Sequence, residues 1–531
     1  MKRIRGLVAA LTAAALALAG CSTAGDDTDD SERLFGYQVP SSLRTTNAGT
    51  LKGSTDLAQT LSGRLYPGVY VPGPSGQMIP NTDLVSTQVL PGDQRKVIYT
   101  LSDAAVFSDG TPVTCADYLL TFTAGQYPSI FGANMPLFGD TEALSCTPGS
   151  KEFTLTFKEH RGARWRGLFE PGTVLPAHAV AKKLGKSVDE LVDDMLSDDF
   201  TRLKPVGEVW RDGFDLGAFD PELQVSFGPF KIESVGDQGQ VRLVANEHYY
   251  GDAPQTPEMV VWPGSANTAE LAASGALRIG DLRDLQPDWH DREAEGNRLQ
   301  VEPVVGELTE MLSLPQVGFW ADAEHRKALS RCVNPRAVAQ ASSEIAGIDV
   351  PVAPLHTVQH ADPLARHMED VAAPHLDVDI EQASSIRGAT LRVGYSYPDE
   401  RWAAMVGSMK RSCEPAGIDI IDVTGDGKTL ADLPSAEYDE WRNEIWTEGE
   451  ADAVLRVVDP KREFPAANNR AQELSALRAQ EEFLWKELPS IPLAAQPRTF
   501  AVDESVRNVV PYTGLSSIGW NMDRWSLATG N

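Results

Sequence analysis

Basic residues are scarce in this chain of 531 residues, which has 47 lysines and arginines against 75 aspartates and glutamates. The formal net charge of −28 at pH 7 argues against nucleic acid as a partner, because binding to a phosphate backbone depends on an excess of positive charge. The same charge argues against an extended anionic surface as a partner. It sets no limit on a small ligand held in a closed cleft.

Catalytic sequence motifs are missing as well. The chain has no G-x-S-x-G, H-E-x-x-H, P-loop or G-x-G-x-x-G string, which are local signatures of several hydrolases, metalloproteases, nucleotide hydrolases and dinucleotide-dependent enzymes. We therefore expect no catalytic residue and no cofactor, and we predict that the protein is not an enzyme. A hydrolase of the cell envelope is the enzymatic alternative.

Cysteine is rare, with five in the chain, and no pair of them has the C-x-x-C spacing of a metal site. We therefore expect no bound metal. Cys21 lies close to the N-terminus, and the other four are Cys115, Cys146, Cys332 and Cys413. An even number of cysteines in an oxidising compartment predicts two disulfides, for which three pairings are open.

Long apolar runs are absent after the first 20 residues, so no later segment is expected to span a membrane. Residues 1–20 have the features of a signal peptide. Lys2, Arg3 and Arg5 precede a short apolar run over 6–18, which is too short to cross a bilayer, and small residues follow it.

The string Leu18-Ala19-Gly20-Cys21 resembles a bacterial lipobox, so we expect Cys21 to be acylated and to become the mature N-terminus. A plain signal peptide with a chance cysteine is the alternative. Residues 21–34 predict a lipidated flexible tether, because their small, polar and acidic side chains cannot bury enough apolar surface to fold. The expected location is the extracytoplasmic face of the cell membrane, with a lipid anchor.

The rest of the chain alternates short β-rich runs with helical stretches. The spacing predicts strands at 97–101 and 153–157 and a hairpin over 230–244. Thr114 is typical of an N-cap residue, so a helix is expected from Cys115 onward. A late amphipathic helix over 472–488 ends at Pro489, and 491–494 is predicted as an edge strand.

Residues 97–122 (VIYTLSDAAVFSDGTPVTCADYLLTF) resemble a specific segment of a known family: the peptide/nickel-type (family 5, cluster C) extracellular solute-binding proteins of ABC importers. The strand, the Asp-Gly turn, the proline and the Ala-Asp helix start have the family's spacing. The matching residues are Phe107, Asp109, Gly110, Pro112, Ala116 and Asp117. Four further matches follow in the family's order, at 228–250, 271–275, 322–338 and 480–493. The acidic loops and the tail around Trp520 and Trp525 resemble actinobacterial lipoproteins of this type.

The resemblance implies an α/β, two-lobed periplasmic-binding-protein-like fold (type II, Venus flytrap) with an inserted subdomain. Lobe I would cover 35–286, with the subdomain at about 63–221. Lobe II would cover 287–489, and 490–531 would return to lobe I. Closure of the lobes traps a ligand without covalent chemistry. The division into lobes favours the disulfides Cys115–Cys146 and Cys332–Cys413, since each pair then lies within one lobe.

Peptide binders of this family hold the ligand's α-amine with an acidic residue just after a tryptophan of lobe II. In the matching region, Tyr438 to Asp452, Trp446 aligns with that tryptophan, and Gly449 takes the place of the acid. Glu448 and Glu450 flank this position, so either is a candidate ligand-binding residue; a solvated acidic loop is the alternative. Further candidates for the aromatic walls of the site are Trp441, Tyr395 and Tyr397.

The partners implied are a peptide or another small solute, a permease with its ATPase, and the membrane through the lipid anchor, with the protein itself a monomer. The segment 459–472 is shorter than in relatives. This shortening motivates a second hypothesis, a non-transport regulator or scaffold of cell-envelope synthesis built on the same fold.

Four of the nine histidines lie in 356–375: His356, His360, His367 and His375. Two of them are four residues apart, which on a helix would suit zinc or nickel. Prolines at 354 and 363 argue against a regular helix, so we interpret the segment as a surface loop.

Overall fold

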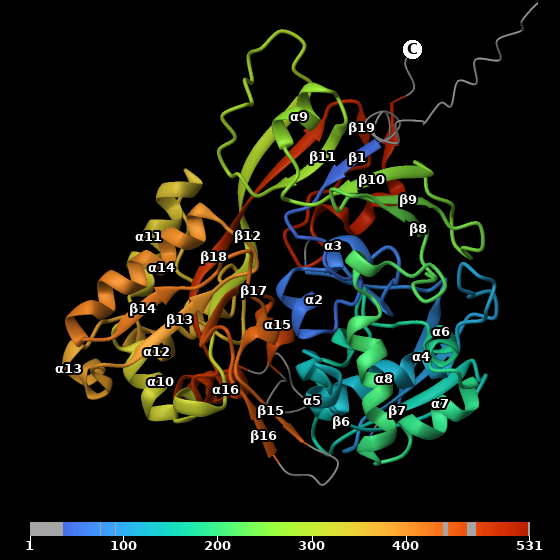
Figure 1. Ribbon diagram of the computed structural model, residues 1–531, viewed down its shortest axis with the longest axis horizontal. Helices are drawn as coiled ribbons and strands as arrows, with labels where there is room; N and C mark the ends of the chain where they lie inside the picture. The colour runs from blue at the N-terminus through green and yellow to red at the C-terminus, as the bar shows by residue number, and fades with distance from the viewer. Residues whose placement is uncertain (1–34, 75, 91, 439–443, 465–473, 529–531) are drawn as a thin grey trace, which may run out of the picture.

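One ten-stranded sheet runs through the whole molecule in the computed structural model (Figure 1). The structure describes residues 35–528 except 75, 91, 439–443 and 465–473. The strands, in the order in which they pair, are β14 (Asp419–Asp422), β13 (Thr390–Gly394), β17 (Ala453–Val458), β12 (Leu299–Ser313), β18 (Ser490–Asp503), β11 (Leu277–Leu282), β1 (Phe35–Gln38), β10 (Glu258–Trp262), β9 (Val241–Ala245) and β8 (Phe230–Val235).

The two long strands β12 and β18 connect the two halves of this sheet. They pair antiparallel from Leu299↔Asp503 to Ser313↔Ser490. At one end β18 also pairs with β11, and at the other end β12 pairs with β17. The chain therefore has two lobes, lobe I around β1 and β8–β11 and lobe II around β13, β14 and β17, and both long strands pass from one to the other.

The β12–β18 ladder is interrupted between Val305 and Thr309 and again between Glu310 and Met311. Pro497 lies opposite Val305, and Pro492 lies opposite Met311. The prediction of an edge strand at 491–494 is therefore wrong, because β18 is a central strand. A central strand accepts proline where its ladder is already irregular, since the missing N–H then breaks no regular bond.

The chain between β1 and β8 forms a body on the lobe I side, drawn in blue and green in Figure 1. A four-stranded antiparallel sheet has the order β4 (Val85–Leu90), β5 (Lys96–Leu101), β7 (Glu152–Phe157) and β6 (Thr141–Ser145). Two more strands, β2 (Tyr70–Pro72) and β3 (Met78–Pro80), pair with each other. Its helices are α2 (Leu51–Thr55), α3 (Gln59–Ser62), α4 (Cys115–Gln126), α5 (Pro128–Phe131), α6 (Ala177–Lys183), α7 (Val188–Met195) and α8 (Phe200–Asp212).

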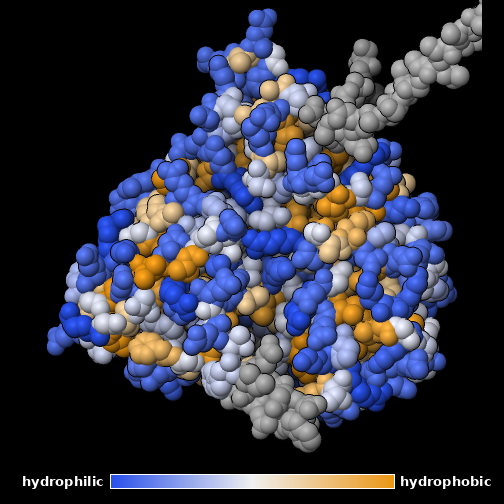
Figure 2. Space-filling model, viewed as in Figure 1, coloured by the Kyte–Doolittle hydropathy of each residue, from blue (hydrophilic) through white to orange (hydrophobic). Residues whose placement is uncertain are grey.

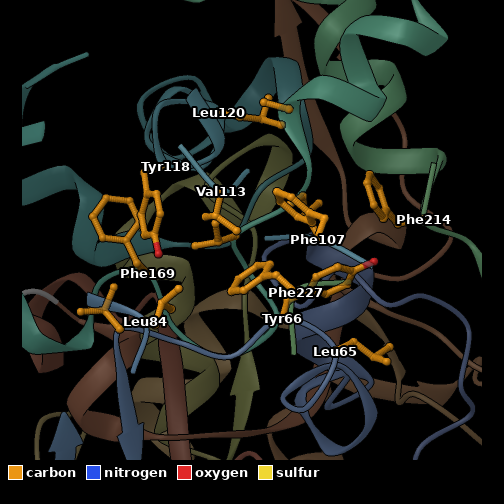
Figure 3. Packing of buried hydrophobic residues seen from close by; sticks show 14 of the residues in the cluster. Leu65, Tyr66, Leu84, Phe107, Val113, Tyr118, Leu120, Phe169, Phe214 and Phe227 are labelled. Carbon is orange, nitrogen blue, oxygen red and sulfur yellow. The ribbon is translucent and has the colours of Figure 1, made fainter. Parts of the chain in front are cut away.

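Several local predictions are confirmed in this body and in lobe I. Strands β5 and β7 and the hairpin β8–β9 lie where the alternation of side chains placed them. Thr114 caps α4, and its partner Asp117 completes a capping box. The core behind this helix is aromatic: the rings of Phe107 and Phe227 meet edge to face at 5.3 Å, close to Tyr66 (Figure 3).

Lobe II packs its helices on its half of the sheet. The main ones are α10 (Ala323–Ser330), α11 (Pro335–Ala346), α14 (Glu400–Cys413) and α16 (Leu474–Glu487), and the short ones include α12 (Glu369–Ala372), α13 (Ile380–Ala383) and α15 (Pro460–Glu463). Helix α9 (Thr268–Ala273) lies in lobe I, before β11. A hairpin, β15 (Ser435–Tyr438) and β16 (Glu444–Thr447), stands apart from the large sheet.

Both disulfides have the expected pairing. Cys115–Cys146 ties the start of α4 to the segment after β6, and Cys332–Cys413 ties the segment after α10 to the end of α14. Each bond stays within one lobe, so neither restricts a movement between the lobes. Among the described residues no helix is both long and apolar enough to cross a bilayer.

Candidate interlobe ligand site

A cavity of about 490 Å³ lies between the two lobes. Its size is within the range of about 300–1,000 Å³ that small-molecule sites occupy. The described lining residues come from the lobe I body (Pro72, Gly73, Gly76, Gln77, Met78, Ala163, Arg164, Arg166, Gly167), from β12 (Glu307), from lobe II (Thr357, Val358, Gln359, Asp362, Pro363, Leu364, Asp459, Lys461, Arg462, Leu477) and from the C-terminal segment (Tyr512). The molecular face shown in Figure 2 is mostly hydrophilic, with apolar residues in scattered patches.

Arg164 connects the lobes at the edge of this cavity. Its guanidinium donates to the carbonyl oxygens of Pro460 at 3.3 Å, Lys461 at 3.0 Å and Phe464 at 2.6 Å, and to that of Thr357 at 3.1 Å. The first three carbonyls lie at or just beyond helix α15, where backbone oxygens lack partners within the helix. One side chain of the lobe I body thus satisfies four backbone groups of lobe II.

A second connection runs from α15 to the lobe I body. The guanidinium of Arg462 lies 2.5 Å from Glu170 and 3.3 Å from Asp459, which is the N-cap residue of α15. The other carboxylate oxygen of Glu170 accepts a hydrogen bond from Gln59 at 2.8 Å. Both acidic partners of Arg462 are thereby held in place, Glu170 in the lobe I body and Asp459 in lobe II.

A third connection between the lobes involves residues just before and at the end of α2. Arg44 donates to the carbonyl oxygen of Ser396 in lobe II at 2.6 Å, and its guanidinium lies 3.4 Å from Asp56. The backbone N–H of Leu430 donates to the hydroxyl of Thr55 at 3.2 Å. Burial raises the pKa of Asp56 to about 6, although Arg44 opposes this shift.

Glu307 is a half-buried acid of the cavity wall and lies on β12 at the interruption of the ladder. Burial, and then the nearby charge of Asp459, raises its pKa to about 7. The hydroxyl of Tyr512 donates to it, and the charges of Lys461 and Arg462 oppose the rise. The carboxyl therefore changes its charge close to neutral pH.

A buried network holds the lobe II wall of the cavity in place. His356 Nδ1 lies 2.7 Å from Glu481 of α16, and its Nε2 lies 3.0 Å from the carbonyl oxygen of Ser490. The backbone N–H groups of His356 and Thr357 and the hydroxyl of Thr357 also donate to Glu481. The interpretation of 356–375 as a surface loop is thus wrong for His356, which is fully buried.

His375 stacks on the ring of Trp485 at 4.0 Å. Within the described residues, no group of three or more His, Cys, Asp or Glu is arranged to hold a metal ion.

Of the aromatic and acidic residues expected to bind ligand, those that the structure describes are not among the residues that line the interlobe cavity. Tyr395 is buried and donates to Asp422, and Tyr397 lies under the guanidinium of Arg283 at 3.5 Å. Trp446 and Glu448 line a different hollow of about 650 Å³ in lobe II.

The remaining two candidates are also accounted for. Glu450 lies on the surface, 2.8 Å from the ammonium of Lys428. Trp441 lies outside the described residues. Of the residues proposed from the matching region, the structure brings together Trp446 and Glu448 only, on the outside of lobe II.

The residues that do line the cavity are marked in the sequence by weaker patterns than the ones used to predict the ligand-binding residues. Asp459-Pro460 directly follows a strand and has the form of an N-cap with proline at the first helical position, which marks the turn at the cavity. Gly306 in a long strand signals the interruption that presents Glu307. Arg164 had no signal, because its partners are backbone carbonyls about 300 residues later in the chain.

A model of the bacterial extracellular solute-binding proteins, family 5 (middle region), matches residues 81–456. The chain belongs to this family. The match covers most of the lobe I body and most of lobe II, including the residues of β17 up to Arg456.

Relatives of similar length are known from mycobacteria. An uncharacterized lipoprotein of Mycobacterium tuberculosis is 29% identical, with 99% of this chain and 98% of that protein covered. An uncharacterized lipoprotein of Mycobacterium leprae is 28% identical, with 98% and 97% covered. The family 5 protein therefore shares its full length with proteins named as lipoproteins.

Solved structures share the two-lobed fold. The oligopeptide-binding protein AppA of Bacillus subtilis, in complex with a nonapeptide, superposes with a TM-score of 0.66 at 13% identity, covering 93% of this chain and 99% of that one. The periplasmic EDTA-binding protein EppA gives 0.65 at 17% identity, with 93% and 96% covered. DppA of Helicobacter pylori, with the peptide STSA, gives 0.63 at 12%, with 94% and 100% covered.

Proposed function

We propose that this protein is the lipid-anchored, extracytoplasmic substrate-binding protein of an ABC transporter, and that it works as a monomer. It holds a peptide or a related small solute in the interlobe cavity and delivers it to a permease driven by an ATPase. The observation that carries the proposal is the cavity of about 490 Å³ at a boundary between the lobes that Arg164 and Arg462 bridge. Solved structures of the same fold hold peptides and small chelates, as their names state.

Capture would work through movement of the lobes about β12 and β18. Both strands pass between the lobes, and their ladder is irregular beside the cavity. Closure brings Arg164 onto the carbonyls of lobe II, while opening releases them to water, so the two states exchange polar contacts without a chemical step.

The anchor would be a lipid on Cys21. The mycobacterial relatives are named as lipoproteins. The described chain begins at β1, in the half of the molecule that β8–β11 form (Figure 1). Residues 22–34 can span at most about 45 Å when extended, so a lipid at Cys21 would keep the start of β1 within that distance of the bilayer. Labelling with an alkyne fatty acid tests this: the wild type takes up label, and Cys21→Ser does not.

The ligand test uses the chain from Ser22 onward, purified under native conditions and studied by native mass spectrometry. A retained small solute that is lost on mild unfolding supports the proposal. A protein without any retained or bindable solute, which co-purifies instead with enzymes of envelope synthesis, would favour the regulator or scaffold alternative.

A further inference from the structure

Glu307 occupies a special place in the interlobe cavity. It lies on β12, one of the two strands that join the lobes, and its backbone N–H donates to the hydroxyl of Thr513 at 3.1 Å. That bond fixes the backbone at the interruption of the ladder. The side chain is half-buried and lines the cavity, and its hydrogen-bonding partner within the protein is the hydroxyl of Tyr512.

The cations around Glu307 are already paired with other acids. The ammonium of Lys461 lies 2.9 Å from Asp362. The guanidinium of Arg462 lies 2.5 Å from Glu170 and 3.3 Å from Asp459. Glu307 therefore faces the cavity as a carboxylate that has no ion pair within the part of the chain that the structure describes, and a carboxylate has about four acceptor positions to fill.

The other charges near Glu307 do not supply a counter-ion either. Arg164 is occupied by lobe II carbonyls, and Arg166 lies over the ring of Trp165 at 4.6 Å. On the neighbouring strand β18, Arg498 forms an ion pair with Asp281. A half-buried carboxylate that has no ion pair costs free energy, because it has lost part of its hydration. A cationic ligand group in this place would therefore be strongly favoured.

Resting on the function proposed above, we propose that Glu307 binds a cationic nitrogen of the solute, so that the cavity selects peptides or amino-acid-like compounds with a free ammonium group. The contact lies on a strand that joins the lobes. The ligand's charge is thereby recognised at the place where the lobes move relative to each other.

The charge of Glu307 makes this binding depend on pH. The empty site has a raised pKa of about 7, because of burial and then Asp459, and an ammonium would lower it. Binding therefore requires loss of the proton below pH 7, and affinity falls by up to tenfold per pH unit as the pH drops. Above about pH 8 a peptide's own α-amine loses its proton, so affinity declines again. The expected optimum lies between about pH 7 and 8.

The experiment uses the soluble chain from Ser22 and a pool of di- to pentapeptides without Lys, Arg or His, offered in free-amine and N-acetylated forms. Native mass spectrometry identifies the retained members, and titration calorimetry measures the best one from pH 5.5 to 9. Glu307→Gln keeps the shape and loses the charge. Glu302→Gln is the matched control, because Glu302 lies on the same strand, exposed and outside the cavity.

We expect the wild type and Glu302→Gln to retain free-amine members at least tenfold better than acetylated ones. Glu307→Gln should bind the free-amine peptide about 10- to 100-fold more weakly at pH 7.5 and without the acidic decline. Equal retention of both forms, or unchanged affinity of Glu307→Gln, overturns the assignment of Glu307 while solute binding stands. Retention of no member by any variant overturns the proposed function as well.

Discussion

Replacing Arg164 by methionine is the sharpest test of how the lobes are held together. Methionine retains an apolar side chain of similar length and removes every donor. Three of the four bonds to lobe II carbonyls are 3.1 Å or shorter, and each is worth about 0.5–1.5 kcal/mol net. We therefore expect the closed state to lose about 2–4 kcal/mol relative to the open state, a factor of about 30 to 1,000 in the closing equilibrium.

The substitution should change the shape of the molecule more than its stability. When the lobes open, water satisfies the freed carbonyls, so the unfolding of each lobe should change little. Small-angle scattering would show a larger radius of gyration for Arg164→Met, and the apparent ligand affinity would fall by the same factor as the closed population.

Arg202→Met is the matched control, because the guanidinium of Arg202 pairs with Asp194 within the lobe I body, at 2.7 Å. An Arg164→Met protein with the scattering curve and affinity of the wild type would refute the role of this contact. A control variant that opens equally would show that the loss of a guanidinium from the lobe I body, and not the loss of the contact with lobe II, opens the molecule.

Three further outcomes follow from the buried contacts and from the outer hollow of lobe II. Glu481→Gln should lower the free energy of unfolding by about 3–5 kcal/mol in urea titrations, because a buried carboxylate that accepts hydrogen bonds from His356 and Thr357 is lost, whereas exposed Glu482→Gln should change it by less than about 0.5 kcal/mol; equal effects would contradict this. Removing the disulfide by Cys332→Ala and Cys413→Ala should cost about 4 kcal/mol, since it closes a separation of 81 residues, and an unchanged melting temperature would count against it. Glu448→Ala should leave solute affinity within twofold by calorimetry, since its hollow is separate from the cavity, and a larger loss would return the site to that hollow.

Local patterns predicted those elements that local chemistry determines. The Thr114 cap and the alternation in 153–157 depend on neighbours a few residues away, and both are found in the structure. The disulfide pairing followed from the division into lobes that the family resemblance implied. In contrast, the position of β18 depends on what pairs with it across the sheet. Pro492 gave a misleading signal, because β18 is irregular at this point: Glu310 and Met311 of β12 pair with Ala494 and Pro492, and the residue between these two is left over.

The interlobe cavity was harder to predict than the local elements, for a physical reason. A resemblance in one hairpin drew attention to Trp446, whose side chain is 55% exposed on the outside of lobe II. The cavity is assembled from residues of seven separate stretches between Pro72 and Tyr512, and Arg164 and Glu307 acquire their roles only when those stretches meet. Likewise, His356 and its partner Glu481 are 125 residues apart in the chain, so the neighbouring sequence alone indicated a surface loop for this histidine.

The interruption of β12 links the fold to the proposed function. A regular ladder between two long strands would resist bending, because each bend would strain a series of hydrogen bonds. Here the ladder is irregular between Val305 and Thr309, and Pro497, opposite Val305, has no N–H to contribute. Glu307 lies in that same interval, so a ligand bound to its carboxylate would contact the segment where bending is easiest. Under the proposed function, solute charge and lobe position are therefore coupled through one stretch of strand, whereas Arg164 connects the lobes at the same cavity from the lobe I body.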